Sequence, residues 1–265
     1  MKLVVAVKQV AALDEEFELL DDGEGVDPDY LEWDLNEWDN FSVEAALQLR
    51  ESTGGDGDEV VVVTVGDEES DEGLRSCLAK GADRAIRVWD ESLAGADALA
   101  VARVLAAAVQ PESPDLVLCG VQSSDAVNGA TGVALAGYLD LPRVAVVTRL
   151  EYDAAGGVLT VDRELEGGLI EVLRVHAPAL LTIQTGINEP RYATLRAIKQ
   201  AREKPLEVKS LGDLGLDREA IATASGSRTV ALATPDRGEG AEMLNGSPAS
   251  VAARIVEIVQ ERLKG

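Results

Sequence analysis

The chain has 265 residues, of which 46% are hydrophobic and only 3% aromatic, and its 48 acidic and 24 basic residues give a net charge of −24. Phosphate backbones and anionic lipids repel so acidic a surface, which argues against a nucleic-acid-binding protein and a membrane-docking protein. No run of roughly 18 apolar residues occurs, so no membrane insertion is expected. The acidic residues are spread along the whole chain, which favours adaptation to a high-salt host over a single acidic docking face.

The chain opens on a short apolar run that we interpret as a first strand rather than a leader, and a cytoplasmic protein is predicted. Strands are expected at 3–7, 60–65, 85–89 and 115–120, and helices at 42–50, 73–80, 97–109 and 127–139. Alternating units of this length predict an α/β fold: an open parallel-sheet, Rossmann-like domain with right-handed crossovers and helices on both faces.

From residue 143 the pattern changes to hairpin strands, at 144–152, 158–165 and 170–176, and a strand at 180–184 then returns to the main sheet. After residue 186 the periodic core pattern is lost, apart from a strand-like run at 229–233 and an amphipathic helix at 249–263. We therefore predict an α/β nucleotide-binding domain with a β-hairpin extension over 1–186 and a long C-terminal arm over 187–265. An arm of this length is too long for a surface loop, so it is expected to wrap another subunit.

Three polar or glycine-rich segments follow predicted strands, where open α/β sheets bind their ligands. They lie at 6–9, at 65–67 and at 120–132, and the last is the best candidate. Its glycines let backbone N–H groups approach a ligand, and a helix beginning near Val127 would direct its positive dipole end at a phosphate. An ordinary capped turn is the alternative interpretation.

Several familiar sites are missing from the sequence. There is no GxxxxGK[ST] motif, and no GxGxxG follows the first strand. His176 has no nucleophile motif nearby and is expected to be a packing or surface residue. Cys77 and Cys119 lie far apart in apolar surroundings and are interpreted as small core residues. No catalytic residue and no metal site are predicted.

Six segments, taken in chain order, resemble one family. They are VAVKQV at 5–10, NEWDNFSVEAA at 36–46, GADR at 81–84, the loop at 120–132, RELEGGL at 163–169 and NEPRYATL at 188–195. Together they are similar to the β subunit of electron-transfer flavoproteins over nearly the whole chain. The octet at 188–195 is the most specific of them.

The resemblance implies a heterodimer whose larger α subunit holds most of an FAD. Its flavin accepts electrons from dehydrogenases such as acyl-CoA dehydrogenases in fatty acid oxidation, and passes them to a membrane quinone reductase or another acceptor. The flavin supplies the redox chemistry, so the β subunit needs no catalytic residues. The β subunit of the family binds a structural AMP or, in bifurcating relatives, a second FAD; Thr131-Gly132 resembles the AMP type.

The same resemblance assigns two sets of residues. The nucleotide is expected at Ala6, Lys8, Asn36, Glu37, Trp38, Asp39, Val65, Gly66, Gly120, Val121, Gln122, Ser123, Ser124, Asp125, Ala126, Val127, Asn128, Gly129, Ala130 and Thr131. Partner contacts are expected at Glu164, Tyr192, Ala193, Thr194 and Leu195. Glu164 matches a glutamate that pairs with an α-subunit arginine, although an exposed strand carboxylate is equally consistent. Leu195 matches a leucine that inserts into partner dehydrogenases, and the basic residues near it (Arg191, Arg196, Lys199 and Arg202) favour its exposure.

Two other functions fit the predicted fold. A stand-alone adenine-nucleotide sensor of the universal-stress type would use the sheet and the loop at 120–132, but has no need of the octet or the arm. An adenylate-forming enzyme should have a glycine-rich pyrophosphate loop after the first strand, and VKQVAALDEEF is not such a loop.

Overall fold

The computed structural model describes residues 1–265 except 14–16, 21–22, 24, 154–155, 235–239 and 264–265. The chain divides into two compact units, Met1–Ala231 and Leu232–Gly265. The first contains the sheet, and the second contains the last helix, α7 (Pro248–Leu263). None of the described helices is long and apolar enough to cross a bilayer.

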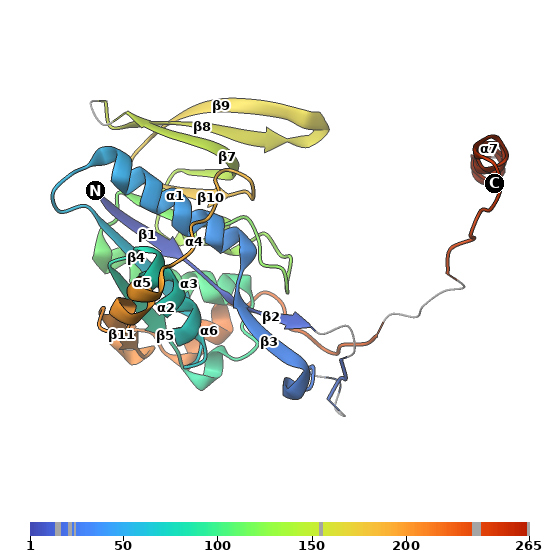
Figure 1. Cartoon of the computed structure of the whole chain (residues 1–265). Coiled ribbons are helices and arrows are strands. Elements are labelled where there is room, and N and C mark those ends of the chain that lie inside the picture. Colours follow the sequence, from blue (N-terminus) through green and yellow to red (C-terminus); the bar gives the residue numbers. More distant parts are fainter. Residues whose placement is uncertain (14–16, 21–22, 24, 154–155, 235–239, 264–265) are drawn as a thin grey trace. The chain divides into compact units, whose positions relative to one another are not determined.

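A nine-stranded sheet forms the centre of the first unit (Figure 1). Its strands are β1 (Lys2–Ala6), β4 (Glu59–Val65), β5 (Arg84–Val88), β6 (Leu116–Gly120), β7 (Arg143–Asp153), β8 (Val158–Leu165), β9 (Leu169–His176), β10 (Ala179–Ile183) and β11 (Leu206–Lys209). They run in the order β11-β5-β4-β1-β6-β10-β7-β8-β9. The strands from β11 to β7 pair in parallel, and β7, β8 and β9 form the antiparallel extension. The predicted open α/β fold with a hairpin extension is confirmed.

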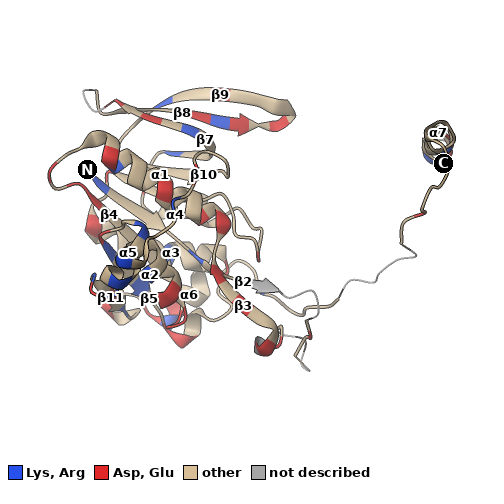
Figure 2. Cartoon of the chain, in the orientation of Figure 1, with Lys and Arg blue, Asp and Glu red and all other residues tan. Residues whose placement is uncertain are grey.

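Helices cover both faces of the parallel strands, which explains their near-continuous apolar sequences. In β4, Val60 and Val62 join the core beneath α1 (Glu37–Thr53) and α2 (Ser70–Lys80). Val61 and Val63 join the opposite core beneath α3 (Ala98–Val109) and α4 (Thr131–Tyr138). Figure 2 shows acidic residues on helices and strands alike, in keeping with their spread along the sequence.

A two-stranded antiparallel sheet between β1 and α1 was not anticipated from the sequence. It pairs β2 (Gln9–Leu13) with β3 (Leu31–Leu35). The pair brings the chain back to where it left β1, so that the N–H of Asn36 donates to the carbonyl of Lys8 at 2.9 Å. The start of α1 is thereby placed at the carboxyl end of β1.

The region after residue 186 contributes more to the first unit than its sequence suggests. β11 pairs in parallel with β5, and Leu211 and Ile221 are buried in the core beneath α3. The helices α5 (Leu195–Ala201) and α6 (Arg218–Ala224) flank this strand in sequence. The loss of core pattern expected from 187 onward is therefore wrong as far as α6, and residues 229–233 form no strand. The predicted final helix is present as α7, and wrapping of a partner by 187–265 stays a prediction.

Candidate functional site

A cavity opens at the carboxyl ends of β1, β4 and β6, and it encloses about 920 Å³ with its open mouth included. The strand order reverses here, because the chain builds the sheet outward on one side of β1 through β4 and β5, and on the other side through β6 and β10. Open α/β sheets bind ligands at such a reversal.

Most of the nucleotide residues expected from the sequence line this one cavity. They are Ala6, Lys8, Asn36, Asp39, Val65, Gly120, Val121, Gln122, Ser123, Ala126, Asn128, Gly129, Ala130 and Thr131. Glu37, Trp38, Gly66, Ser124, Asp125 and Val127 lie outside the lining. The structure thus brings four distant segments together, whereas their contact with a ligand stays a prediction.

One wall of the cavity, formed by the beginning of α3, was not predicted from the sequence. Ala96, Asp97, Ala98, Val101 and Leu105 belong to it, and Val7, Cys119, Gly132 and Leu135 complete the lining. An Asp before an alanine-rich helix is an N-cap signal, and it could have placed this helix start at the same edge of the sheet.

Asp97 uses its two carboxylate oxygens for different partners. Oδ1 accepts the N–H groups of Leu99 at 3.1 Å and Ala100 at 3.0 Å, which caps α3. Oδ2 accepts the N–H groups of Gly226 at 2.7 Å and Ser227 at 2.9 Å. The carboxylate therefore joins the cavity wall to the segment that follows α6.

Asn36 holds the loop after β6 against the start of α1. Its side chain is almost completely buried, with 1% of the residue exposed. Nδ2 donates to the carbonyl of Gln122 at 2.8 Å, and Oδ1 accepts the N–H of Ser124 at 3.2 Å. An amide, which both donates and accepts, suits this position.

Asp39 joins the ends of β1 and β6 from one turn further along α1. Its oxygens accept the backbone N–H groups of Lys8 and Gly120, each at 2.8 Å. Burial raises the pKa of this carboxyl to about 7, although both N–H groups favour the charged form. Asp39 is therefore a buried acid that changes its charge near neutral pH.

Two glycines of the candidate loop are required by packing. A Cβ on Gly120 would lie 2.5 Å from Cβ of Trp38 and 2.7 Å from Oδ1 of Asp39. A Cβ on Gly132 would lie 2.5 Å from Sγ of Cys119. These glycines let the loop and α4 approach their neighbours closely, a role that is separate from ligand approach.

The helix after this loop begins later than predicted. Val127 has a φ of +50°, in the left-handed region, so the backbone cannot continue there as a helix. α4 begins at Thr131, and its N-cap residue Ala130 makes no side-chain cap. Among the described residues, the N–H groups at the start of α4 therefore have no side-chain acceptor, whereas the start of α3 is capped by Asp97. An anion is favoured at α4 and disfavoured at α3.

Lys8 is the basic side chain of the described cavity lining, and it faces the loop. Its Nζ lies 2.7 Å from both oxygens of Asp125 and 3.3 Å from Oγ of Ser123. This ion pair links the end of β1 to the loop after β6.

The remaining sequence candidates fall away from the cavity. Tyr192 is 98% exposed and Leu195 is 81% exposed, which confirms the predicted exposure of Leu195, whereas Ala193 is half-buried and packs against the core. Glu164 is exposed on β8, and His176 is exposed on β9.

The cysteines behave as the sequence analysis expected. Cys77 and Cys119 are buried and free, and both belong to the hydrophobic cores. Burial raises the pKa of the Cys77 thiol to about 12 and that of Cys119 further, so neither is a reactive thiolate. Among the described residues, no group of three or more His, Cys, Asp or Glu is placed to hold a metal ion.

Comparison with known proteins gives matches over most of the chain. Residues 25–214 match the electron transfer flavoprotein domain. The chain is 49% identical over 262 residues to the electron transfer flavoprotein subunit beta of Methylophilus methylotrophus, covering 98% of each protein. The subunit beta of Bacillus subtilis is 33% identical over 265 residues, covering 100% of this chain and 99% of that protein. That of Sus scrofa is 38% identical over 222 residues, covering 82% of this chain and 84% of that protein.

Proposed function

The chain belongs to the electron transfer flavoprotein family as a β subunit, and from this premise we propose that it binds one AMP in the cavity at the ends of β1 and β6. In the proposed complex an α subunit holds the FAD. The flavin receives electrons from dehydrogenases such as acyl-CoA dehydrogenases, and delivers them to a membrane quinone reductase or a similar acceptor. The β subunit carries no catalytic residue of its own in this function.

The observation that carries the AMP proposal is the uncapped start of α4 at the cavity. An adenylate phosphate would be held by N–H groups at Ala130 and Thr131, where the helix dipole favours negative charge. The Asp97 carboxylate at the α3 side would repel a phosphate, which favours an orientation with that end of the ligand toward α4. The apolar residues Val65 and Val101 of the lining offer surface for the purine.

The bound flavin would supply the electron-carrying chemistry, and this chain would supply a fixed binding site for the nucleotide. Lys8 and Asp125 fix the loop over β1, Asn36 fixes it to α1, and Asp39 joins the two strand ends. These contacts make the cavity a preformed site, so AMP binding would add rigidity to the subunit without changing its fold. The role of AMP in this proposal is structural.

The cofactor content of the purified complex tests the proposal. The chain, coexpressed with its α subunit, is expected to give a yellow one-to-one complex. Mass spectrometry of the denatured complex should find FAD and AMP in equal amounts. If the complex instead contains two FAD molecules and no AMP, the AMP proposal is wrong and the chain is a subunit of the bifurcating type. A colourless chain that purifies alone with an adenine nucleotide would favour the stand-alone sensor.

We also propose that dehydrogenases dock at Tyr192, Ala193, Thr194 and Leu195. A Leu195→Ala variant of the heterodimer is expected to raise the KM for an acyl-CoA dehydrogenase about tenfold, because a leading apolar anchor is lost. Flavin content and flavin potential should stay unchanged. Val208→Ala removes another exposed apolar side chain, from β11, and it is expected to leave the KM unchanged. An unchanged KM in Leu195→Ala, or a loss of flavin, would contradict the docking proposal.

Glu164 is the second proposed partner contact. It lies exposed near the turn of the β8–β9 hairpin, where an arginine of the α subunit could pair with it. The pair would lie at the proposed subunit interface, and the carboxylate would add negative charge close to the flavin.

A further inference from the structure

Arg191 lies directly before the proposed docking residues, Tyr192 to Leu195, yet its guanidinium contacts α1. Its Nε donates to Oε2 of Glu44 at 2.8 Å, and its backbone N–H donates to the same oxygen at 3.1 Å. A second guanidinium nitrogen reaches Oε1 of Glu44 at 3.0 Å. Nη1 also donates to Oε1 of Glu51 at 2.6 Å, and Nη2 donates to Oε2 of Glu51 at 3.1 Å. We call these guanidinium contacts with Glu44 and Glu51 the Arg191 fork.

These contacts distinguish Arg191 from Arg196, Lys199 and Arg202, the other basic residues near Leu195, which are exposed. Glu44 is only 4% exposed, so its charge is compensated inside the protein by Arg191. Burial acts to raise the pKa of Glu44, but the hydrogen bonds from Arg191 outweigh it and the pKa lies below its usual value. Bidentate pairing of this kind fixes geometry as well as charge.

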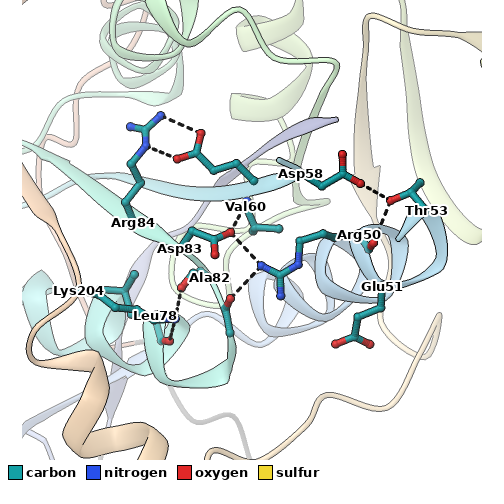
Figure 3. Close-up of polar contacts among 12 residues, drawn as sticks. Arg50, Glu51, Thr53, Asp58, Val60, Leu78, Ala82, Asp83, Arg84 and Lys204 are labelled. Carbon is teal, nitrogen blue, oxygen red and sulfur yellow. Dashed lines mark hydrogen bonds and ion pairs between the residues drawn. The ribbon is translucent and has the colours of Figure 1, made fainter. Parts of the chain in front are cut away.

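The far end of the same segment is held against α2. Nη1 of Arg75 donates to the carbonyls of Ala201 and Lys204, each at 2.8 Å. Nζ of Lys204 in turn donates to the carbonyl of Leu78 at 3.0 Å and to that of Ala82 at 2.6 Å (Figure 3). The chain from Arg191 to Lys204 is therefore fixed at both ends.

The two helices that hold this segment are themselves joined. Nη1 of Arg50, in α1, donates to Oδ2 of Asp83 at 2.8 Å and to the carbonyl of Gly81 at 3.2 Å, both in the turn after α2 (Figure 3). The neighbouring Glu51 belongs to the Arg191 fork. The Arg191 contacts and the Lys204 contacts are thus joined through the hydrogen bonds of Arg50 to the turn after α2.

We infer that Arg191 is a positioning residue whose contacts with Glu44 and Glu51 hold the docking segment, Tyr192 to Leu195, in one orientation for its partner. The inference rests on the proposed docking function. A segment that is already ordered loses less conformational entropy when it binds its partner. Release of the fork is therefore expected to weaken docking without changing any residue that touches the partner.

The test compares Arg191→Gln with Arg196→Gln in the intact heterodimer. Arg196 is exposed and has no hydrogen bond or ion pair among the described residues, so it controls for the lost charge. Arg191→Gln should raise the KM for the acyl-CoA dehydrogenase about tenfold and leave kcat unchanged. Amide hydrogen exchange should become faster at 192–197, while Arg196→Gln should change neither quantity by more than about twofold.

A double variant separates positioning from folding, because Arg191→Gln alone leaves the buried Glu44 carboxylate without a positively charged partner. In Glu44→Gln/Arg191→Gln the buried charge is gone, so the unfolding midpoint should recover while the KM and the exchange rates stay raised. A normal KM and normal exchange in the double variant would overturn the inference, as would an equal rise in KM in Arg196→Gln. If Leu195→Ala alone leaves the KM unchanged, the docking function has failed, and the exchange rates at 192–197 still decide whether Arg191 orders the segment.

Discussion

A Gly120→Ala variant is expected to lose about 3 kcal/mol of unfolding free energy and to retain no nucleotide. The added Cβ would lie 2.5 Å from Cβ of Trp38, 3.2 Å from the carbonyl carbon of that residue and 2.7 Å from Oδ1 of Asp39. Backbone and a buried carboxylate cannot rotate away as a flexible side chain can. The strand end must shift instead, which stretches the hydrogen bond from the Gly120 N–H to Asp39. Urea unfolding and the AMP content of the heterodimer measure the two effects.

Gly137→Ala provides the matched control for this prediction. Gly137 lies in α4, and a Cβ at this position would meet no heavy atom within 4 Å. Alanine is the better helix former, so the variant is expected to gain up to about 1 kcal/mol and to keep its nucleotide. Equal unfolding curves for Gly120→Ala and the unmodified chain would show that the end of β6 is not packed as described.

A second large effect is expected from pH, through Asp39. Its pKa is raised by burial to about 7, from an ordinary value of 3.8. The native chain therefore keeps a proton that the unfolded chain releases at lower pH. The stabilising contribution is complete below about pH 4 and is lost as the pH rises through about 7. Between pH 5 and pH 8 this carboxyl should remove roughly 2.5 kcal/mol of unfolding free energy.

Asp39→Asn isolates this contribution, because an amide does not titrate. The variant is expected to be less stable at pH 5, since its amide nitrogen faces a backbone N–H donor where an oxygen accepted before. Its stability should then change less between pH 5 and pH 8 than that of the unmodified chain, by roughly 2.5 kcal/mol. Asp56→Asn removes an exposed charge and should keep the original pH dependence. Urea unfolding at fixed salt measures all three, and parallel curves for the unmodified chain and Asp39→Asn would exclude Asp39 as the titrating group.

The central fold could be predicted because its strands are buried on both faces. A run such as Val60 to Val63 is apolar on both faces, which identifies it as a buried strand. The alternation of such strands with helices of similar length is compatible with few topologies. β11 could not be found in this way. It is an edge strand of four residues, Leu206–Lys209, in which charged side chains occupy two positions. Its place in the sheet is set by pairing with β5 rather than by an apolar pattern.

The candidate site could be predicted in part, for topological reasons. The loop after β6 directly follows a buried strand, so strand ends alone identify it. The Asp97 wall cannot be found from strand ends, because α3 connects β5 to β6 and crosses over β4 and β1 on the way. The late start of α4 was also hidden, since valine rarely adopts the left-handed conformation found at Val127.

The double role of Asp97 has a thermodynamic consequence. One carboxylate serves both the pocket wall and the polypeptide at Gly226 and Ser227. If a molecule bound in the pocket strengthens the hydrogen bonds from Gly226 and Ser227 to Asp97 by some factor, then an external restraint on Gly226 and Ser227 strengthens the binding of that molecule by the same factor. Any partner that restrains Gly226 and Ser227 would then strengthen binding in the pocket, and the equilibrium result would not depend on which of the two is added first.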